Sequence, residues 1–238
     1  MRLDKFFSET TPLSRRESTE KIRKGNVSVN GRTVKRPEEK IDPEKDEIFL
    51  DGVKVPYRKF LYVMMNKPEG VVSATEDGRD RTVLDLLPPE YRKFGLFPCG
   101  RLDKDTVGFL LLTNDGEGAH RALSPKRHVE KDYFFRLADP LKEEDIAVAE
   151  KGVLLADGYT TKPFVVRRTG EREGVITLTE GKYHEIKRIF AARGNKVVFL
   201  KRISFAGIPL DETLAPGGYR FLTEEEINLF LSSSPAGK

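Results

Sequence analysis

The sequence has few of the features that mark secreted or membrane proteins. Its 238 residues include a single cysteine, Cys99, which rules out a disulfide framework and favours a reducing compartment. No apolar run approaches the roughly 20 residues that a transmembrane helix needs. The first residues also lack the apolar stretch of a secretory signal peptide. We therefore expect a cytoplasmic protein.

Several common catalytic motifs are missing as well. The chain has no G-x-x-x-x-G-K-[ST] phosphate loop and no G-x-S-x-G nucleophile motif. The stretch HEIKR at His184 begins like a zinc-protease helix but lacks the second histidine four residues on. With three histidines and one cysteine in the whole chain, zinc ligands are scarce. We expect neither a metal ion nor a cofactor.

Charge is abundant and unevenly distributed. Lys, Arg, Asp and Glu make up 34% of the residues, and the net charge is +4. Residues 1–36 hold ten Lys and Arg but only four Asp and Glu, an excess of six positive charges that leaves the rest of the chain at −2. A basic segment at one end of a chain is typical of a module that binds a polyanion.

The sequence pattern changes near residue 56, which predicts two domains. Residues 1–56 are expected to form a small helix-plus-hairpin domain, residues 57–60 a linker, and residues 61–238 a larger domain. In the larger domain, predicted strands outnumber predicted helices and do not alternate strictly with them. This pattern favours an α+β fold with a mixed, mostly antiparallel sheet.

Local signals place the elements of both domains. In the first, Ser14 and Glu17 have the spacing of a capping box, and Asn-Gly at residue 30 and Asp-Gly at residue 51 are hairpin turns. In the second, we predict strands at 59–66, 108–114, 130–138, 163–168, 174–180 and 196–205. We predict helices there at 117–124, 142–152, 182–194 and 223–233.

The helix predicted after Ser14 carries four basic residues. Arg16, Arg23 and Lys24 recur at spacings of seven and eight and so share a face, with Arg15 one position away. Such a face is often simply solvated. The charge excess of the whole segment instead favours contact with nucleic-acid phosphates, which a small helix-plus-hairpin unit has room to make.

Asp103 is the strongest candidate for a chemical role. It stands in GRLDKDT, between Arg101 and Lys104, just before a predicted buried strand. An aspartate there could simply cap or turn the loop. Alternatively, a carboxylate held by a cation can act as a nucleophile. The helix predicted within EGKYHEIKRIF offers such a cation, because Lys187 and Arg188 lie beside apolar residues.

Four stretches resemble the RNA pseudouridine synthases, specifically the branch that modifies small-subunit ribosomal RNA (RsuA-type). They are GRLDKDTVGFLLLTNDG around Asp103, MNKPEGVVSAT from Met65, SPKRHVEKDYFFRL from Ser124, and EGKYHEIKRIFAARGNKVVFLKRISFAGIPL from Glu180. The SRR…I..G.V.VNG pattern from Ser14 also resembles the RNA-binding domain first described in ribosomal protein S4. The resemblance covers nearly the whole chain in the expected order.

The resemblance implies roles for single residues. Asp103 matches the catalytic aspartate, which attacks the target uridine at the sugar C1′ or on the base. Tyr133 matches a tyrosine that stacks on the uracil and helps to remove the C5 proton. Lys187 matches the basic partner of the aspartate, with Arg188 as the neighbouring alternative.

Two further positions match residues that contact RNA. Arg101 matches an arginine that enters the RNA where the target base leaves, and Ile186 matches an aliphatic residue that packs on the base. Two positions depart from the family. Phe109 stands where the family usually has Leu, a core substitution that we expect to leave the chemistry unchanged, and Glu185 stands where relatives often have Gln. We expect Glu185 to add negative charge near Lys187.

The sequence thus predicts an enzyme that isomerises a uridine, most simply in 16S ribosomal RNA, using an aspartate nucleophile on a flipped-out base. Ribosomal RNA or a small-subunit assembly intermediate is the expected partner, and the chain is expected to be a monomer. Two alternatives stay open: the same chemistry on large-subunit RNA, and a non-catalytic RNA-binding factor in ribosome assembly.

Overall fold

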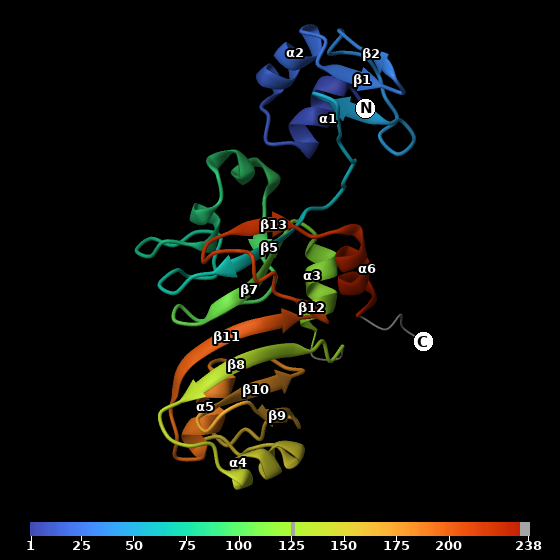
Figure 1. Ribbon diagram of the computed structural model, residues 1–238. Helices are drawn as coiled ribbons and strands as arrows, with labels where there is room; N and C mark the ends of the chain where they lie inside the picture. Colours follow the sequence, from blue (N-terminus) through green and yellow to red (C-terminus); the bar gives the residue numbers. More distant parts are fainter. Residues whose placement is uncertain (125–126, 234–238) are drawn as a thin grey trace. The chain divides into compact units, whose positions relative to one another are not determined.

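The computed structural model describes residues 1–124 and 127–233 (Figure 1). Its contacts divide the chain into two compact units, Met1–Leu61 with Leu87–Gly95, and Tyr62–Leu86 with Leu96–Lys238. The segment Leu87–Gly95, which contains the 3₁₀-helix η2 (Pro89–Phe94), was expected in the second domain but groups with the first. Its local sequence pattern carries no sign of this, because the grouping depends on contacts between segments distant in sequence.

The first unit combines two helices with a four-stranded sheet. Its elements are α1 (Leu3–Thr10), α2 (Arg15–Arg23), β1 (Val27–Val29), β2 (Arg32–Thr33), β3 (Ile48–Leu50) and β4 (Val53–Lys54). The strand order is β2-β1-β3-β4, and every neighbouring pair is antiparallel. Both predicted hairpins are present. Asn30 (φ 52°) and Gly31 (φ 77°) are both left-handed, as the two-residue type I′ turn requires.

The core of the first unit follows from the spacing of its apolar residues. Leu3, Phe6 and Phe7 lie on one face of α1 and are fully buried. They pack in one cluster with apolar residues of α2, of the sheet and of the segment between β2 and β3 (Ile22, Val27, Val29, Val34, Ile41 and Ile48). The predicted capping box is also confirmed. The Ser14 side chain accepts from the Glu17 amide, and the Glu17 carboxylate accepts from the Ser14 amide.

The second unit is built on a nine-stranded sheet. Its strands are β5 (Tyr62–Lys67), β6 (Phe97–Pro98), β7 (Val107–Thr113), β8 (Lys131–Leu137), β9 (Val165–Arg168), β10 (Glu173–Leu178), β11 (Val197–Phe205), β12 (Ile208–Pro209) and β13 (Tyr219–Phe221). The main order is β13-β5-β7-β11-β8-β10-β9. The β7–β11 pair is parallel and the other pairs are antiparallel, so the predicted mixed, mostly antiparallel sheet is confirmed.

Short helices accompany this sheet. They are the α-helices α3 (Gly116–Leu123), α4 (Glu143–Ala147), α5 (Glu185–Ala192) and α6 (Glu224–Ser232), and the 3₁₀-helices η1 (Val83–Leu86) and η3 (Val148–Lys151). Helices α3 and α6 lie side by side (Figure 1). Asp115 caps α3 by accepting from the Gly118 amide and also accepts from the Tyr62 hydroxyl of β5, which attaches the helix to the sheet.

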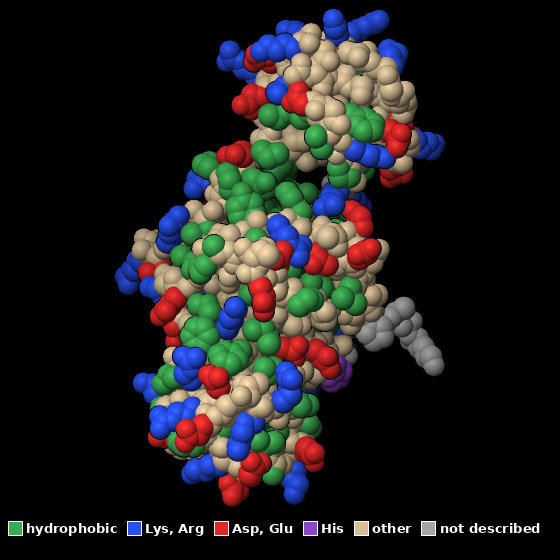
Figure 2. All heavy atoms as spheres, in the orientation of Figure 1, with side chains coloured by type: hydrophobic (Ala, Val, Ile, Leu, Met, Phe, Trp, Pro, Cys, Tyr) green, Lys and Arg blue, Asp and Glu red, His purple; other side chains and the backbone are tan. Residues whose placement is uncertain are grey.

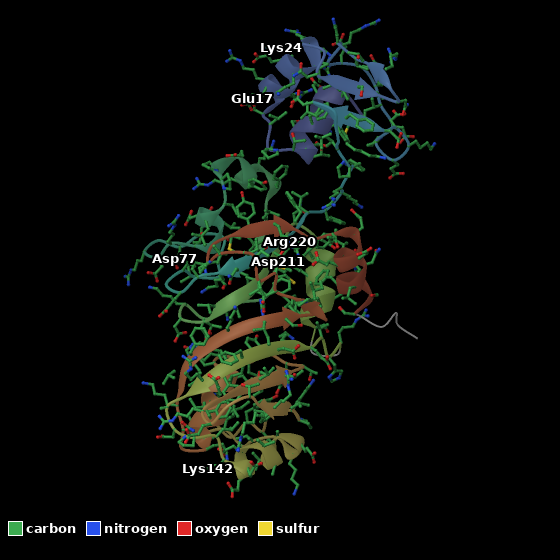
Figure 3. All side chains as sticks on the ribbon, viewed as in Figure 1. Glu17, Lys24, Asp77, Lys142, Asp211 and Arg220 are labelled. Carbon is green, nitrogen blue, oxygen red and sulfur yellow. The ribbon has the colours of Figure 1, made fainter. Side chains whose placement is uncertain are left out.

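Several elements differ from the sequence prediction, among them the strands β6 and β12 and the 3₁₀-helices η1 and η2, which were not predicted. The helix expected from residue 182 begins only at Glu185, because His184 has φ 50° and a left-handed residue cannot continue a right-handed helix. Strand β13 was not predicted. Its Arg220 lies beside Asp211 (Figure 3) and donates to Asp211 at 2.6 Å and to both carboxylate oxygens of Glu226 at 2.8 Å. These bonds join the strand to the preceding loop and to the first turn of α6.

The α-helices are short, and the longest that the structure describes, α2 and α6, have nine residues each. Among the described residues, no helix has the length and apolar character needed to cross a membrane.

Candidate active site

The parallel junction between β7 and β11 brings the two halves of the site together. Asp103 lies in the loop before β7, and Lys187 lies on α5, which precedes β11. The register pairs Gly108 of β7 with Arg202 of β11. At Gly108 φ is +99°, and an added Cβ would lie 2.3 Å from the Arg202 carbonyl oxygen. Only glycine allows this close approach of the two strands.

Lys187 forms two ion pairs across this junction. Its Nζ donates to Asp103 Oδ2 at 2.9 Å and to Asp105 Oδ1 at 2.6 Å. Burial by itself would lower the pKa of Lys187, but the hydrogen bonds to Asp105 and Asp103 outweigh it and raise the pKa. The ammonium group therefore stays charged at neutral pH. No role was predicted for Asp105 from the sequence, but in the structure Asp105 and Asp103 both accept from the Lys187 ammonium group.

Lys67 holds the loop that carries Asp103 and Asp105, here called the aspartate loop, through hydrogen bonds to its backbone. It is the last residue of β5, and its side chain is fully buried. Its Nζ donates to three carbonyl oxygens, those of Pro68 at 3.1 Å, Lys104 at 3.3 Å and Thr106 at 2.9 Å. Burial lowers the pKa of Lys67 to about 8, although Asp105 and Asp103 act in the opposite direction. A buried cation thus fixes the backbone on both sides of Asp105.

A pocket of about 80 Å³ opens beside the Asp103–Lys187 pair, several times the volume that one water molecule needs. Five predicted site residues line it: Arg101, Asp103, Tyr133, Ile186 and Lys187. They come from the loop before β7, from β8 and from α5. The structure therefore gathers five residues that the sequence spreads over 86 positions, although their individual roles remain predictions.

Tyr133 enters the pocket wall from the middle of the sheet. On β8 it is paired with Ile176 of β10 on one side and with Arg202 of β11 on the other. Only 8% of the residue is exposed. Because a strand with partners on both sides is rigid, the ring is held in a set position for a flat ligand to stack on.

Arg188 is engaged away from the aspartate. Its guanidinium lies 2.5 Å from an Asp157 carboxylate oxygen and donates to the Tyr183 carbonyl at 3.3 Å. Of the two neighbouring cations on α5, Lys187 is therefore the one that pairs with Asp103. The sequence pattern alone did not decide which of these two cations pairs with Asp103, because both lie near one helix face.

The four basic residues predicted to contact RNA lie on α2 or at its C-cap and are all exposed (Arg15, Arg16, Arg23 and Lys24), but some of them have ion-pair partners. Arg15 lies 3.3 Å from Asp4, and Lys24 donates to Glu20 at 2.6 Å. Lys24 is labelled on α2 in Figure 3. On the face that Figure 2 shows, Lys and Arg side chains surround the part that carries α1 and α2, with Asp and Glu between them. RNA contact by these residues stays a prediction.

Several residues that line the pocket were not predicted as site residues, among them His184, Glu180 and Glu185. His184 Nε2 lies 3.5 Å from Asp103 Oδ1, and its ring stacks on Tyr183 with centroids 3.8 Å apart. Its position one turn before Lys187 is the signal that could have identified it. Glu180 and Glu185 also line the pocket. Glu185, which we expected to add negative charge near Lys187, is only 4% exposed.

Comparison with known sequences gives a consistent result over both units. The sequence model of the family described as RNA pseudouridylate synthase matches residues 61–192, and that of the S4 domain matches residues 1–48. The first match contains every predicted residue of the pocket. The segment Ser124–Leu137 within it includes residues 125 and 126, which lie outside the described part of the chain.

Whole proteins of similar length are also close in sequence. An uncharacterized RNA pseudouridine synthase of Bacillus subtilis is 50% identical, covering 96% of this chain and 98% of its own. Ribosomal small subunit pseudouridine synthase A of Escherichia coli is 41% identical, covering 95% and 98%. A crystal structure of a pseudouridylate synthase superimposes with a TM-score of 0.68 at 40% identity, covering 97% of this chain and 99% of that one.

Proposed function

We propose that this chain, which belongs to the RNA pseudouridine synthase family, acts on a uridine of small-subunit ribosomal RNA. The isomerisation of uridine to pseudouridine is the activity of the family. The assignment of small-subunit ribosomal RNA as the substrate rests on named relatives. One is the Haemophilus influenzae protein named ribosomal small subunit pseudouridine synthase A, which is 42% identical over 95% of this chain. The observation that carries the chemistry is the Asp103–Lys187 pair at the mouth of the pocket.

The reaction rearranges bonds without a net change in composition. An Asp103 carboxylate oxygen attacks the nucleotide, at C1′ or on the base, and the N1–C1′ bond breaks. The uracil turns and C5 bonds to C1′, the bond to Asp103 breaks and returns the free carboxylate, and the C5 proton leaves while N1 gains one. Lys187 holds the carboxylate in place before the attack. Its second partner, Asp105, keeps the ammonium group in position when Asp103 becomes esterified and loses its charge.

A uridine stacked in an RNA helix cannot reach Asp103, so the base must leave the stack at a cost of a few kcal/mol. Tyr133 offers the aromatic face on which the flipped uracil stacks, with Ile186 packing on the base. Tyr133 then helps to take the C5 proton. Arg101, at the rim of the same pocket, fills the gap in the RNA and neutralises phosphate charge.

The S4 domain binds RNA through phosphates and shape, as its basic composition supports. We propose Arg15, Arg16, Arg23 and Lys24 on α2 as contacts, with Arg16 and Arg23 contributing most because Arg15 and Lys24 have ion-pair partners. We further propose a monomer that works in the cytoplasm on ribosomal RNA or on a small-subunit assembly intermediate.

Release of tritium from RNA labelled at uridine C5 tests this proposal. We expect release from small-subunit RNA or particles, none from large-subunit RNA, and loss of release in Asp103→Asn. Asp139→Asn, a change of the same kind at an exposed position, is the matched control and should behave as wild type. Release from large-subunit RNA alone would refute small-subunit RNA as the substrate and show that large-subunit RNA is the substrate instead. Equal release from Asp103→Asn would refute the nucleophile, and no release from any RNA would leave a non-catalytic binding factor.

A further inference from the structure

Two acidic side chains are buried against each other in the wall of the pocket. Glu180 follows β10 and is 7% exposed, and Glu185 opens α5 and is 4% exposed. Both line the pocket that holds Asp103 and Lys187. Two carboxylates so placed would repel each other strongly if both were ionised. The Asp103–Lys187 ion pair does not explain why Glu180 and Glu185 are both buried here.

Hydrogen bonds show where the negative charge is accommodated. The two Glu180 oxygens accept from the Lys162 amide at 2.8 Å and from the Tyr159 hydroxyl at 2.7 Å. Glu185 Oε2 accepts from the Lys182 amide at 2.7 Å. The remaining oxygen, Glu185 Oε1, is buried and has no donor among the described residues.

A shared proton accounts for this remaining oxygen. Both carboxyl groups are buried in the same pocket wall, and a proton on one of them, donated to the other, gives the unpartnered Glu185 oxygen a partner. Burial, followed by the bond to Glu180, raises the pKa of Glu185 to about 7. Burial acts to raise the pKa of Glu180 as well, but its bonds to Glu185, Lys162 and Tyr159 lower it. The proton therefore resides on Glu185 and the charge on Glu180.

The surrounding charged groups are consistent with this division. Lys131 on β8 is near enough to favour ionisation of Glu185, but its Nζ donates to the Val129 carbonyl at 2.7 Å. Burial lowers the pKa of Lys131 to about 8. The Lys162 ammonium favours the charged form of Glu180, and Tyr159 has its pKa raised to about 12, so it remains a donor.

Because Glu185 is the first residue of α5, its contacts affect where this helix begins. Helix α5 has His184 at its N-cap in a left-handed conformation, and this residue makes no side-chain capping bond to any described residue. Glu185 instead holds the preceding turn through the Lys182 amide and holds β10 and the 159–162 loop through Glu180. Lys187 and Ile186 follow directly, so this anchor decides how they face Asp103 and the pocket.

We propose that Glu185 is a positioning residue that works as a neutral acid, donating its proton to Glu180 so that α5 begins where Lys187 can hold Asp103. This inference rests on the proposed function, since it concerns the same site. Loss of the proton leaves two carboxylates in contact and displaces the start of α5. Glutamine at this position retains a donor of nearly the same shape and has no proton to lose in this range.

The test compares pH profiles of single-turnover tritium release for wild type, Glu185→Gln and Glu185→Ala. Above pH 7 the wild-type rate should fall toward tenfold per pH unit. Glu185→Gln should match wild type near pH 6.5 within about twofold and lose most of this decline. Glu185→Ala should be slow at every pH. Lys131 is unchanged in all variants, so its titration is common to the profiles. Glu173→Gln, at the half-buried start of β10 and outside the pocket lining, is the matched control.

Two results would overturn the inference. One is an identical decline in wild type and Glu185→Gln, which places the titration elsewhere. The other is a folded but inactive Glu185→Gln, which would show that a neutral donor is not sufficient. A second readout is independent of activity: the infrared band of a protonated carboxyl group, present in wild type at pH 6 and lost in Glu185→Gln. If this band behaves as expected while no RNA releases tritium, the proposed function fails and the proton assignment stands.

Discussion

Gly108→Ala should separate the two strands that carry the halves of the active site. The new methyl group would lie 2.3 Å from the Arg202 carbonyl oxygen and 2.9 Å from the Lys201 Cγ atom, at a φ of +99° that suits only glycine. The backbone strain costs about 1–3 kcal/mol, and overpacking of a filled site costs a similar amount. We therefore expect a loss of roughly 2–6 kcal/mol in the free energy of unfolding.

Equilibrium urea unfolding measures this loss. The chain has no tryptophan, so far-ultraviolet circular dichroism and tyrosine fluorescence are the suitable probes. The midpoint should fall by roughly 1–2 M urea. Gly116→Ala is the matched control, because an added Cβ there meets no described atom within 4 Å and the residue opens α3. This control should equal wild type or be slightly more stable.

The activity of Gly108→Ala provides a second measure. In the fraction that remains folded, tritium release should fall because Asp103 depends on β7 and Lys187 on the α5–β11 segment. An unchanged urea midpoint with an unchanged slope would refute the reasoning, since it would mean that the β7–β11 contact can relax at no cost.

Three other perturbations test separate parts of the structure. Lys67→Met should lower the turnover rate because three carbonyls near Asp103 lose their donor. In wild type, stability should rise between about pH 8 and 10.5, because the folded protein binds fewer protons there than the unfolded chain. Urea midpoints measured across this pH range should show that Lys67→Met lacks this rise. Ser14→Ala should cost about 1 kcal/mol in thermal unfolding of the first unit, and no change would contradict the capping role. Arg16→Gln with Arg23→Gln should lower the salt dependence of RNA binding by about 1–2 in log–log slope, whereas Lys45→Gln, an exposed control, should not.

Local features were predictable from the sequence because neighbouring residues alone produce them. The capping box at Ser14 needs two side chains three positions apart, and the hairpin at Asn30-Gly31 needs two residues that tolerate positive φ. Asp103 was identifiable because its motif is contiguous. The start of α5 was placed three residues too early, since helical periodicity does not reveal that His184 is left-handed.

The partners of the charged residues, by contrast, depended on the tertiary structure. The family resemblance predicted that Lys187 pairs with Asp103 across 84 positions, and this pairing is present, but only the structure showed that Lys187 pairs with Asp105 as well. Lys67 was not identified from the sequence as a site residue, yet it is fully buried and donates to carbonyl oxygens of the aspartate loop. Glu185 looked like an added negative charge until its burial against Glu180 was known. A residue's type and local pattern indicate what chemistry it can do, whereas its desolvation and the distant groups that surround it decide its protonation state and its partner.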